Sequence, residues 1–204
     1  MHLFDQRVLG IIILLLMALL VTVKRATTGS IFDKPKGNLM VQLVNIFNLF
    51  FLLVVNPLAA VMLIARRMAE VDPTHMIIAG PIILMVLEIA GLILYVTGYF
   101  LMAWALITIG RNYQLGGSTP RSDDKMVIDG PYKLIRHPMY TSALLIALGL
   151  SCLIQSWAFF CVFFIYLVLI SLLIPMEEKA LQSVYGAQYA AYRQKVKKLI
   201  PFVY

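Results

Sequence analysis

The sequence predicts an all-α protein that crosses a membrane about five times. Of its 204 residues, 61% are hydrophobic and only 13% are charged, and the mean hydropathy is +0.88. A soluble domain typically has about half apolar and about a quarter charged residues. The apolar residues also form long runs, which short stretches containing Lys and Arg separate. These observations favour a single integral membrane domain over residues 1–204.

The first part of this domain, residues 1–109, predicts three membrane spans. Residues 8–23 form a short apolar run, and no small-residue cleavage site follows it, so we interpret it as a span and not as a signal peptide. The second span covers residues 39–65, with a kink expected at Asn56 and Pro57. The third begins near Pro81, because proline suits the first turn of a helix, and ends at about Ile109.

Polar side chains inside these spans have two interpretations. Gln42, Asn45 and Asn48 recur every three residues, so they lie along one helix face. They either join helices through hydrogen bonds or line a polar cavity. Glu88 is the one charged residue in the run 76–110, and a carboxyl group in lipid is costly. We expect a protonated Glu88 to bond to Asn56 on the adjoining helix, with a functional carboxyl as the alternative.

The second part, residues 110–204, contains a helical hairpin. Residues 139–176 carry no charged side chain, and a single helix of that length would reach about 57 Å, nearly twice the hydrocarbon thickness of a bilayer. Two antiparallel helices that turn at residues 155–157 fit instead. The hairpin returns the chain to the membrane face that it left, so Arg136 and His137 are predicted to lie beside Glu177 and Glu178.

A helix on the membrane surface is predicted to follow the hairpin. Its apolar and aromatic positions recur every three or four residues, and Gly186 is a natural bend. These positions are Leu181, Tyr185, Tyr189, Tyr192 and Val196. We expect an amphipathic cytoplasmic helix, which serves either as an anchor or as a lid over the neighbouring acidic pair.

The basic residues predict the orientation. Fourteen fall on one side if the loop 110–138 is cytoplasmic, against three on the other. The fourteen are Lys24, Arg25, Lys34, Lys36, Arg111, Arg121, Lys125, Lys133, Arg136, Lys179, Arg193, Lys195, Lys197 and Lys198, and the three are Arg7, Arg66 and Arg67. An excess of Lys and Arg marks the cytoplasmic side, so the amino terminus is predicted outside and the carboxyl terminus and the site inside.

Several function classes are disfavoured. The sequence has no glycine-rich nucleotide motif, and its basic residues flank the spans, which argues against nucleic-acid binding. Cys152 and Cys161 lie within apolar runs, where a metal would lack ligands and a disulfide would serve little purpose. No metal is expected.

The residues at both ends of the hairpin suggest a binding site for a small zwitterion with an aromatic ring. Arg136 supplies a forked donor, Tyr132 and Tyr140 supply aromatic faces, and Glu177 and Glu178 can accept hydrogen bonds from an ammonium group. The first turn after Pro138 is also expected to present free amides to an anion. The alternative is a belt of interfacial anchors.

These motifs resemble the isoprenylcysteine carboxyl methyltransferases and their phospholipid methyltransferase relatives. The resemblance rests on residues 130–132, 136–140, the pair at 177–178, the tyrosines after 184, and Pro201. It implies a membrane enzyme that transfers a methyl group from S-adenosylmethionine to a lipidic acceptor. The residues that match the family's cofactor site are Lys125, Met126, Val127, Tyr132, His137, Pro138, Met139, Tyr140 and Glu177, and we assign Arg136 and Glu178 as candidate catalytic residues.

One departure leaves the acceptor open. Carboxyl methyltransferases of this family carry an arginine four residues before the acidic residue that Glu177 matches, and this chain has Leu173 there. Besides a prenylcysteine carboxylate, the acceptor candidates are a phenolic or quinone-like hydroxyl, a thiol and a phospholipid amine. Two other functions also remain: a sterol-reductase-like membrane enzyme that uses NADPH, and a membrane scaffold or transporter.

Overall fold

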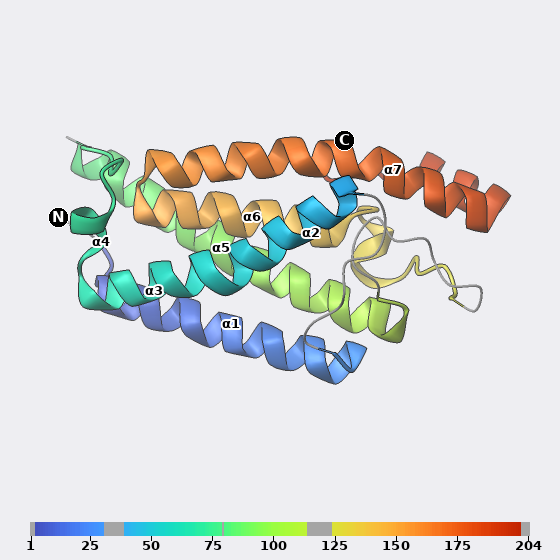
Figure 1. Ribbon diagram of the computed structural model, residues 1–204, viewed down its shortest axis with the longest axis horizontal. Helices are drawn as coiled ribbons and strands as arrows, with labels where there is room; N and C mark the ends of the chain where they lie inside the picture. Colours follow the sequence, from blue (N-terminus) through green and yellow to red (C-terminus); the bar gives the residue numbers. More distant parts are fainter. Residues whose placement is uncertain (1–2, 31–38, 79, 114–123, 201–204) are drawn as a thin grey trace.

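The computed structural model describes residues 3–30, 39–78, 80–113 and 124–200. Lys34, Lys36, Arg121 and Pro201, which the sequence analysis uses, lie outside these ranges. Most of the described residues are helical and none forms a strand, and the long helices run side by side along the bundle (Figure 1). The α-helices are α1 (Gln6–Thr28), α2 (Leu39–Phe50), α3 (Asn56–Ala65), the short α4 (Met68–Val71), α5 (Pro81–Ile109), α6 (Pro138–Ile154) and α7 (Trp157–Lys195). A π-helix (Phe51–Val55) and two short 3₁₀ helices (Gly110–Asn112 and Gly130–Lys133) complete the list.

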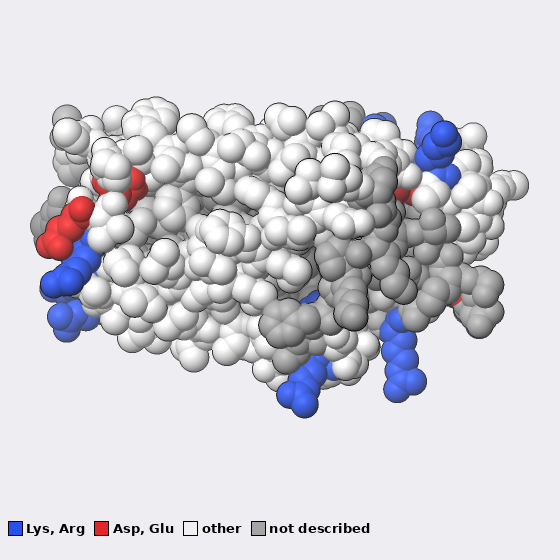
Figure 2. Space-filling view, viewed as in Figure 1, with Lys and Arg blue, Asp and Glu red and all other residues white. Residues whose placement is uncertain are grey.

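The prediction of about five spans is confirmed. Within the described ranges, four helical segments are long and apolar enough to cross a membrane: Gln6–Thr28, Leu39–Ala65, Pro81–Asn112 and Trp157–Lys195. The 17 residues of α6 rise about 25 Å, which is near the lower limit for a span. On the face shown in Figure 2, charged side chains lie at the left end and over the right half of the molecule, and the stretch between them carries none. This distribution matches a bilayer around the middle of the bundle.

The second span is irregular just before Asn56 and Pro57, where the sequence predicts a kink. The irregularity is the π-helix Phe51–Val55. The backbone N–H of Asn56 donates to the carbonyl of Phe51, five residues back, and the Asn56 side chain donates to the same carbonyl over 2.9 Å. Pro57 follows directly and has no N–H to give to the helix. A π-turn shifts the register of the helix that follows, and such turns are frequent at functional sites.

The predicted bond between Glu88 and Asn56 is wrong. Asn56 instead accepts a 2.8 Å hydrogen bond from the hydroxyl of Tyr95, two turns further along α5. Glu88 accepts from the backbone N–H of Leu3 over 2.7 Å and from Gln155 over 3.4 Å. It therefore fastens the amino terminus to the α6–α7 turn at one end of the bundle. The prediction failed because α5 is displaced along α3 by about two turns, which brings Tyr95 and not Glu88 to Asn56.

The hairpin turns where the sequence predicts. Gln155 has the left-handed conformation (φ 56°, ψ 52°) between α6 and α7, and its carbonyl accepts from the N–H of Met76 over 2.7 Å. The loop before α5 also caps α7, because the carbonyl of Thr74 accepts from Trp157 and its hydroxyl accepts from Ala158. The N-terminus of a helix leaves such N–H groups without partners, so this loop holds the turn in place.

Helix α6 lies between α5 and α7 (Figure 1). Gly149 allows a close approach to α5, because a Cβ at this position would lie 2.5 Å from the backbone nitrogen of Tyr95. Most residues of α6 are buried, as expected for the central helix of a bundle.

Beyond the hairpin, α7 continues without a break through Glu178 and reverses at Gly186. That glycine has φ 52° and ψ −125°, a conformation that side chains disfavour. A straight helix would separate residues 178 and 193 by about 22 Å. Both instead contact one guanidinium group, that of Arg136. The predicted bend at Gly186 is thus a reversal, and we call residues 187–199 the return segment.

Candidate functional site

A cavity of about 280 Å³ lies at the end of the bundle where α6 begins. All nine residues that the resemblance assigns to the cofactor line it: Lys125, Met126, Val127, Tyr132, His137, Pro138, Met139, Tyr140 and Glu177. Arg136 lines it as well, whereas Glu178 lies behind Arg136. The hairpin therefore brings the two distant motifs to the same end of the bundle, as the sequence predicts.

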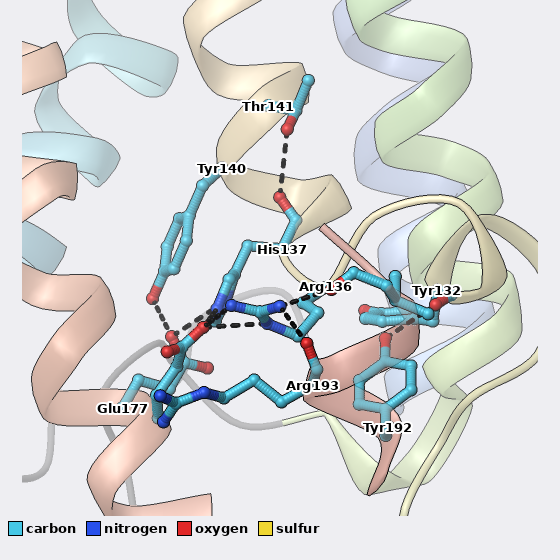
Figure 3. A network of polar contacts seen from close by, with 10 residues as sticks. Tyr132, Arg136, His137, Tyr140, Thr141, Glu177, Tyr192 and Arg193 are labelled. Atoms are coloured by element: carbon cyan, nitrogen blue, oxygen red, sulfur yellow. Dashed lines mark hydrogen bonds and ion pairs between the residues drawn. The ribbon is translucent and has the colours of Figure 1, made fainter. Parts of the chain in front are cut away.

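Arg136 is the centre of the polar network at this end (Figure 3). Its Nε and Nη2 donate to Oε1 of Glu178 over 2.9 and 2.7 Å. Its Nη1 donates to the carbonyl of Arg193 over 3.1 Å and to that of Val196. Both side chains of the ion pair are buried. The pair thus joins the start of α6, the middle of α7 and the return segment.

His137 and Tyr140 hold the acidic pair from the other side. Nε2 of His137 lies 3.3 Å from Glu178 Oε1, and Nδ1 lies 3.8 Å from Glu177 Oε2. The Tyr140 hydroxyl donates to Glu177 Oε2 over 2.6 Å, and the Tyr140 ring stacks on that of His137. Glu177 remains partly exposed on the cavity wall, so its carboxylate can still accept a bond from a ligand.

The return segment closes the polar end of the cavity. The hydroxyl of Tyr192 donates to the carbonyl of Tyr132 over 2.6 Å. The carbonyls of Lys197 and Lys198 accept from the backbone N–H groups of Arg136 and His137. Burial, with the nearby charge of Glu177, raises the pKa of Tyr132 above its ordinary value, so this phenol stays protonated.

The loop before α6 is held against the same cavity by two hydrogen bonds. The hydroxyl of Tyr185 donates to the carbonyl of Asp124 over 3.3 Å, and the side chain of Asn112 donates to the carbonyl of Lys125 over 3.4 Å. These contacts bring residues 125–127 onto the wall, where the resemblance places them.

The first turn of α6 is less open to an anion than predicted. The carbonyl of His137 accepts from the N–H groups of both Tyr140 and Thr141. The N–H of His137 itself is bound to Lys198, and Pro138 has none. These bonds occupy the amides of His137, Tyr140 and Thr141, so the turn offers fewer free N–H groups to a ligand than predicted.

Tyr189 and Asn48 also line the cavity, and neither belongs to the set of site residues predicted from the sequence. Tyr189 was interpreted as part of an amphipathic stripe; it is 2% exposed, lines the cavity, and its hydroxyl has no hydrogen-bond partner among the described residues. Asn48 also lines the cavity, in agreement with the second interpretation of the amide face. The amide spacing was the available signal for Asn48, whereas nothing in the local sequence distinguishes Tyr189 from its neighbours.

The other end of the cavity is apolar and lies among the spans. Leu20 and Val21 come from α1, and Leu52 and Leu53 come from the π-helix. The irregular turn of the second span thus contributes directly to this wall. One cavity therefore connects a polar, tyrosine-rich end with a hydrophobic end at membrane depth.

Comparisons with known proteins find related sequences and a related fold. Protein-S-isoprenylcysteine O-methyltransferase B of Arabidopsis thaliana is 32% identical over 125 residues, which cover 55% of this chain and 58% of that protein. The protein-S-isoprenylcysteine O-methyltransferase of Schizosaccharomyces pombe is 32% identical over 108 residues, 52% of this chain and 46% of that protein. The chain thus spans about half the length of these curated relatives.

A solved structure supports the fold. The eukaryotic intramembrane Ras methyltransferase ICMT, an isoprenylcysteine carboxyl methyltransferase, superposes with a TM-score of 0.54 at 23% identity, covering 80% of this chain and 74% of that chain. Residues 86–188 match the phospholipid methyltransferase family. This match extends over half of the chain and includes α6, the acidic pair and the loop that lines the cavity. The chain therefore belongs to the phospholipid methyltransferase family.

Proposed function

We propose that this protein is an S-adenosylmethionine-dependent methyltransferase that acts on a lipidic acceptor at the cytoplasmic face of a membrane. The observation that carries the proposal is the single cavity that joins the acidic, tyrosine-rich end to an apolar end between the spans. A charged cofactor fits the first end, and the hydrocarbon part of an acceptor fits the second. Family membership favours this proposal over the reductase and scaffold alternatives.

The donor set of the polar end suits this cofactor. Glu177 presents a carboxylate to the cavity and can accept from the cofactor's ammonium group, while Tyr132 and Tyr140 offer aromatic faces to its adenine ring and sulfonium. Lys125, Met126, Val127, His137, Pro138 and Met139 complete the wall. When bound, the cofactor supplies a methyl group on a positively charged sulfur that departs as a neutral thioether.

Positioning and exclusion of water supply most of the catalysis in this proposal. The sulfonium is already a good leaving group, so the residues of the chain need to align the acceptor and keep water out. The return segment covers the polar end and favours such exclusion. The contacts of Arg136 and Glu178 favour a positioning role for this pair, because their polar atoms are bound to each other and to the return segment.

The acceptor is proposed to enter with its chain along the apolar wall. The names of the relatives point to an isoprenylcysteine, and the family description points to a phospholipid. A phenolic or thiol lipid is a further candidate. All these acceptors combine a long hydrocarbon part with one polar reacting group. The cavity likewise combines an apolar end with a polar end.

Calorimetric titration with S-adenosylhomocysteine tests the cofactor assignment. The detergent-solubilised protein should bind it, and Glu177→Ala and His137→Ala should abolish the binding because they remove the carboxylate and its support. The control is Glu88→Gln, at the other end of the bundle, which should lower thermal stability and leave the affinity unchanged. Unchanged affinity in the first two variants, or binding of NADPH in place of S-adenosylhomocysteine, would overturn the proposal.

A further inference from the structure

The return segment turns its backbone toward the site and leaves basic side chains on the outside. The carbonyl of Lys197 accepts from the backbone N–H of Arg136 over 2.7 Å, and the carbonyl of Val196 accepts from the Arg136 guanidinium. Lys195 and Lys197 are nevertheless exposed, and neither ammonium group has an acidic partner among the described residues. The same short stretch therefore contacts the site on one side and presents positive charge on the other.

Hydrogen bonds hold the end of this segment at the depth where a span begins. Helix α6 starts at Pro138, directly before the uncharged run 139–176. The hydroxyl of Thr141, in the first turn of α6, donates to the carbonyl of Leu199 over 2.8 Å. Ile200, the next residue, is 53% exposed, so it offers an apolar side chain at this level. The lysines just before it therefore lie at the level of the lipid headgroups.

The chain after Glu178 is basic and contains no acidic residue. The acidic pair that precedes it is directed inward, because Glu178 is bound to Arg136 and Glu177 accepts from Tyr140. Basic side chains near a membrane surface attract anionic lipids, and each one adds to the attraction. The basic residues within 179–204 are Lys179, Arg193, Lys195, Lys197 and Lys198.

We infer that the return segment is a docking surface for the headgroups of anionic phospholipids in the surrounding membrane, with Lys195 and Lys197 as its main contacts. A general excess of basic residues on one side of a membrane protein accounts for the charge, but not for the backbone bonds that tie these residues to the site. Headgroups that hold the two side chains also hold the segment against Arg136, which keeps the polar end of the cavity closed. Anionic lipid therefore strengthens cofactor binding, and this last step rests on the proposed function.

Hydrogen exchange in nanodiscs of two compositions tests the surface itself. The full chain is placed, without cofactor, in phosphatidylcholine alone and in equal parts of phosphatidylcholine and phosphatidylserine. Amide exchange over residues 187–198 should be about tenfold slower with phosphatidylserine, and high salt should remove the difference because it screens the charges. Equal exchange in the two compositions, or a difference that high salt leaves intact, would overturn the inference.

Charge variants test whether the two lysines carry the effect. Lys195→Gln combined with Lys197→Gln removes two charges and leaves every backbone bond, so the tenfold response should shrink to about twofold. Arg25→Gln combined with Lys179→Gln is the matched control, since it removes the same charge from exposed positions outside the return segment at the same end of the bundle, and it should keep the full response. A full response in the first variant would contradict the assignment of these lysines.

Titration with S-adenosylhomocysteine in the same nanodiscs separates this inference from the proposed function. The affinity of the unchanged protein should be severalfold higher with phosphatidylserine, and that of the double lysine variant should be the same in both compositions. An affinity of the unchanged protein that ignores the lipid composition would refute the coupling to the cavity. Absence of binding in both compositions would reject the proposed function, whereas the exchange experiment would still decide whether the surface binds anionic lipid.

Discussion

Arg136 and Glu178, 42 residues apart in the chain, are joined by two hydrogen bonds from one guanidinium to one carboxylate oxygen. The pair is buried, and the remaining side of the guanidinium holds the carbonyls of Arg193 and Val196. One side chain thus fixes the two ends of the hairpin and the return segment together. The shape of the cofactor end of the cavity depends on this contact.

Replacing Arg136 by lysine should loosen the return segment. A lysine keeps the charge but cannot make the forked set of bonds, and breaking a buried pair typically costs about 3–5 kcal/mol. We expect faster amide hydrogen exchange over residues 187–198 and weaker S-adenosylhomocysteine binding. Arg25→Lys, at an exposed position of α1, is the control and should change neither measurement. Unaltered exchange in Arg136→Lys would show that the bonds to the return segment contribute little.

Replacing Gly186 by alanine should weaken the reversal of α7 through the backbone alone. A Cβ at Gly186 would have no atom within 4 Å, so no clash arises, but φ 52° with ψ −125° is strained for any residue with a side chain. The expected cost is about 1–3 kcal/mol. It should appear as a lower melting temperature and easier proteolysis after residue 186. Ala187→Ser, next to it and exposed, should melt as the unchanged protein does; equal melting of both variants would contradict the prediction.

Asp72 should make stability depend on acid pH at the opposite end of the bundle. Burial acts to raise its pKa, but the nearby Ser156 hydroxyl, two hydrogen bonds from Thr74 and nearby His75 together lower the pKa below its ordinary value. The contribution of a carboxyl with a lowered pKa is complete above its unfolded value and is lost as the pH falls through the folded value. Stability should therefore decline below about pH 4.

Melting curves of the solubilised protein between about pH 6 and about pH 2.5 check this expectation. Asp72→Asn should lower the melting temperature at neutral pH and flatten its decline in acid, because the replaced side chain cannot titrate. Asp129→Asn is the control: that carboxylate is exposed and pairs with exposed Lys133. An acid decline of the same size in Asp72→Asn would assign the effect to other groups.

The local sequence was enough to predict the spans and the hairpin. The third span begins at Pro81 and ends at Ile109, and the hairpin turns at Gln155, as predicted. The spans follow from the transfer of apolar runs into lipid, and the turn follows from the conformations of single residues. Both are local properties of the sequence. The cofactor-site residues were found through their motif, and the hairpin explains why they meet.

Only the tertiary structure decided which polar groups are partners. Glu88 bonds to the amino terminus and Asn56 to Tyr95, because helix packing, including the close contact at Gly149, sets how far α5 slides along its neighbours. The periodicity of one helix contains no information on that displacement. The same holds for Tyr189 and Asn48, whose places on the cavity wall depend on a chain reversal and on the packing of α2 against helices distant in sequence.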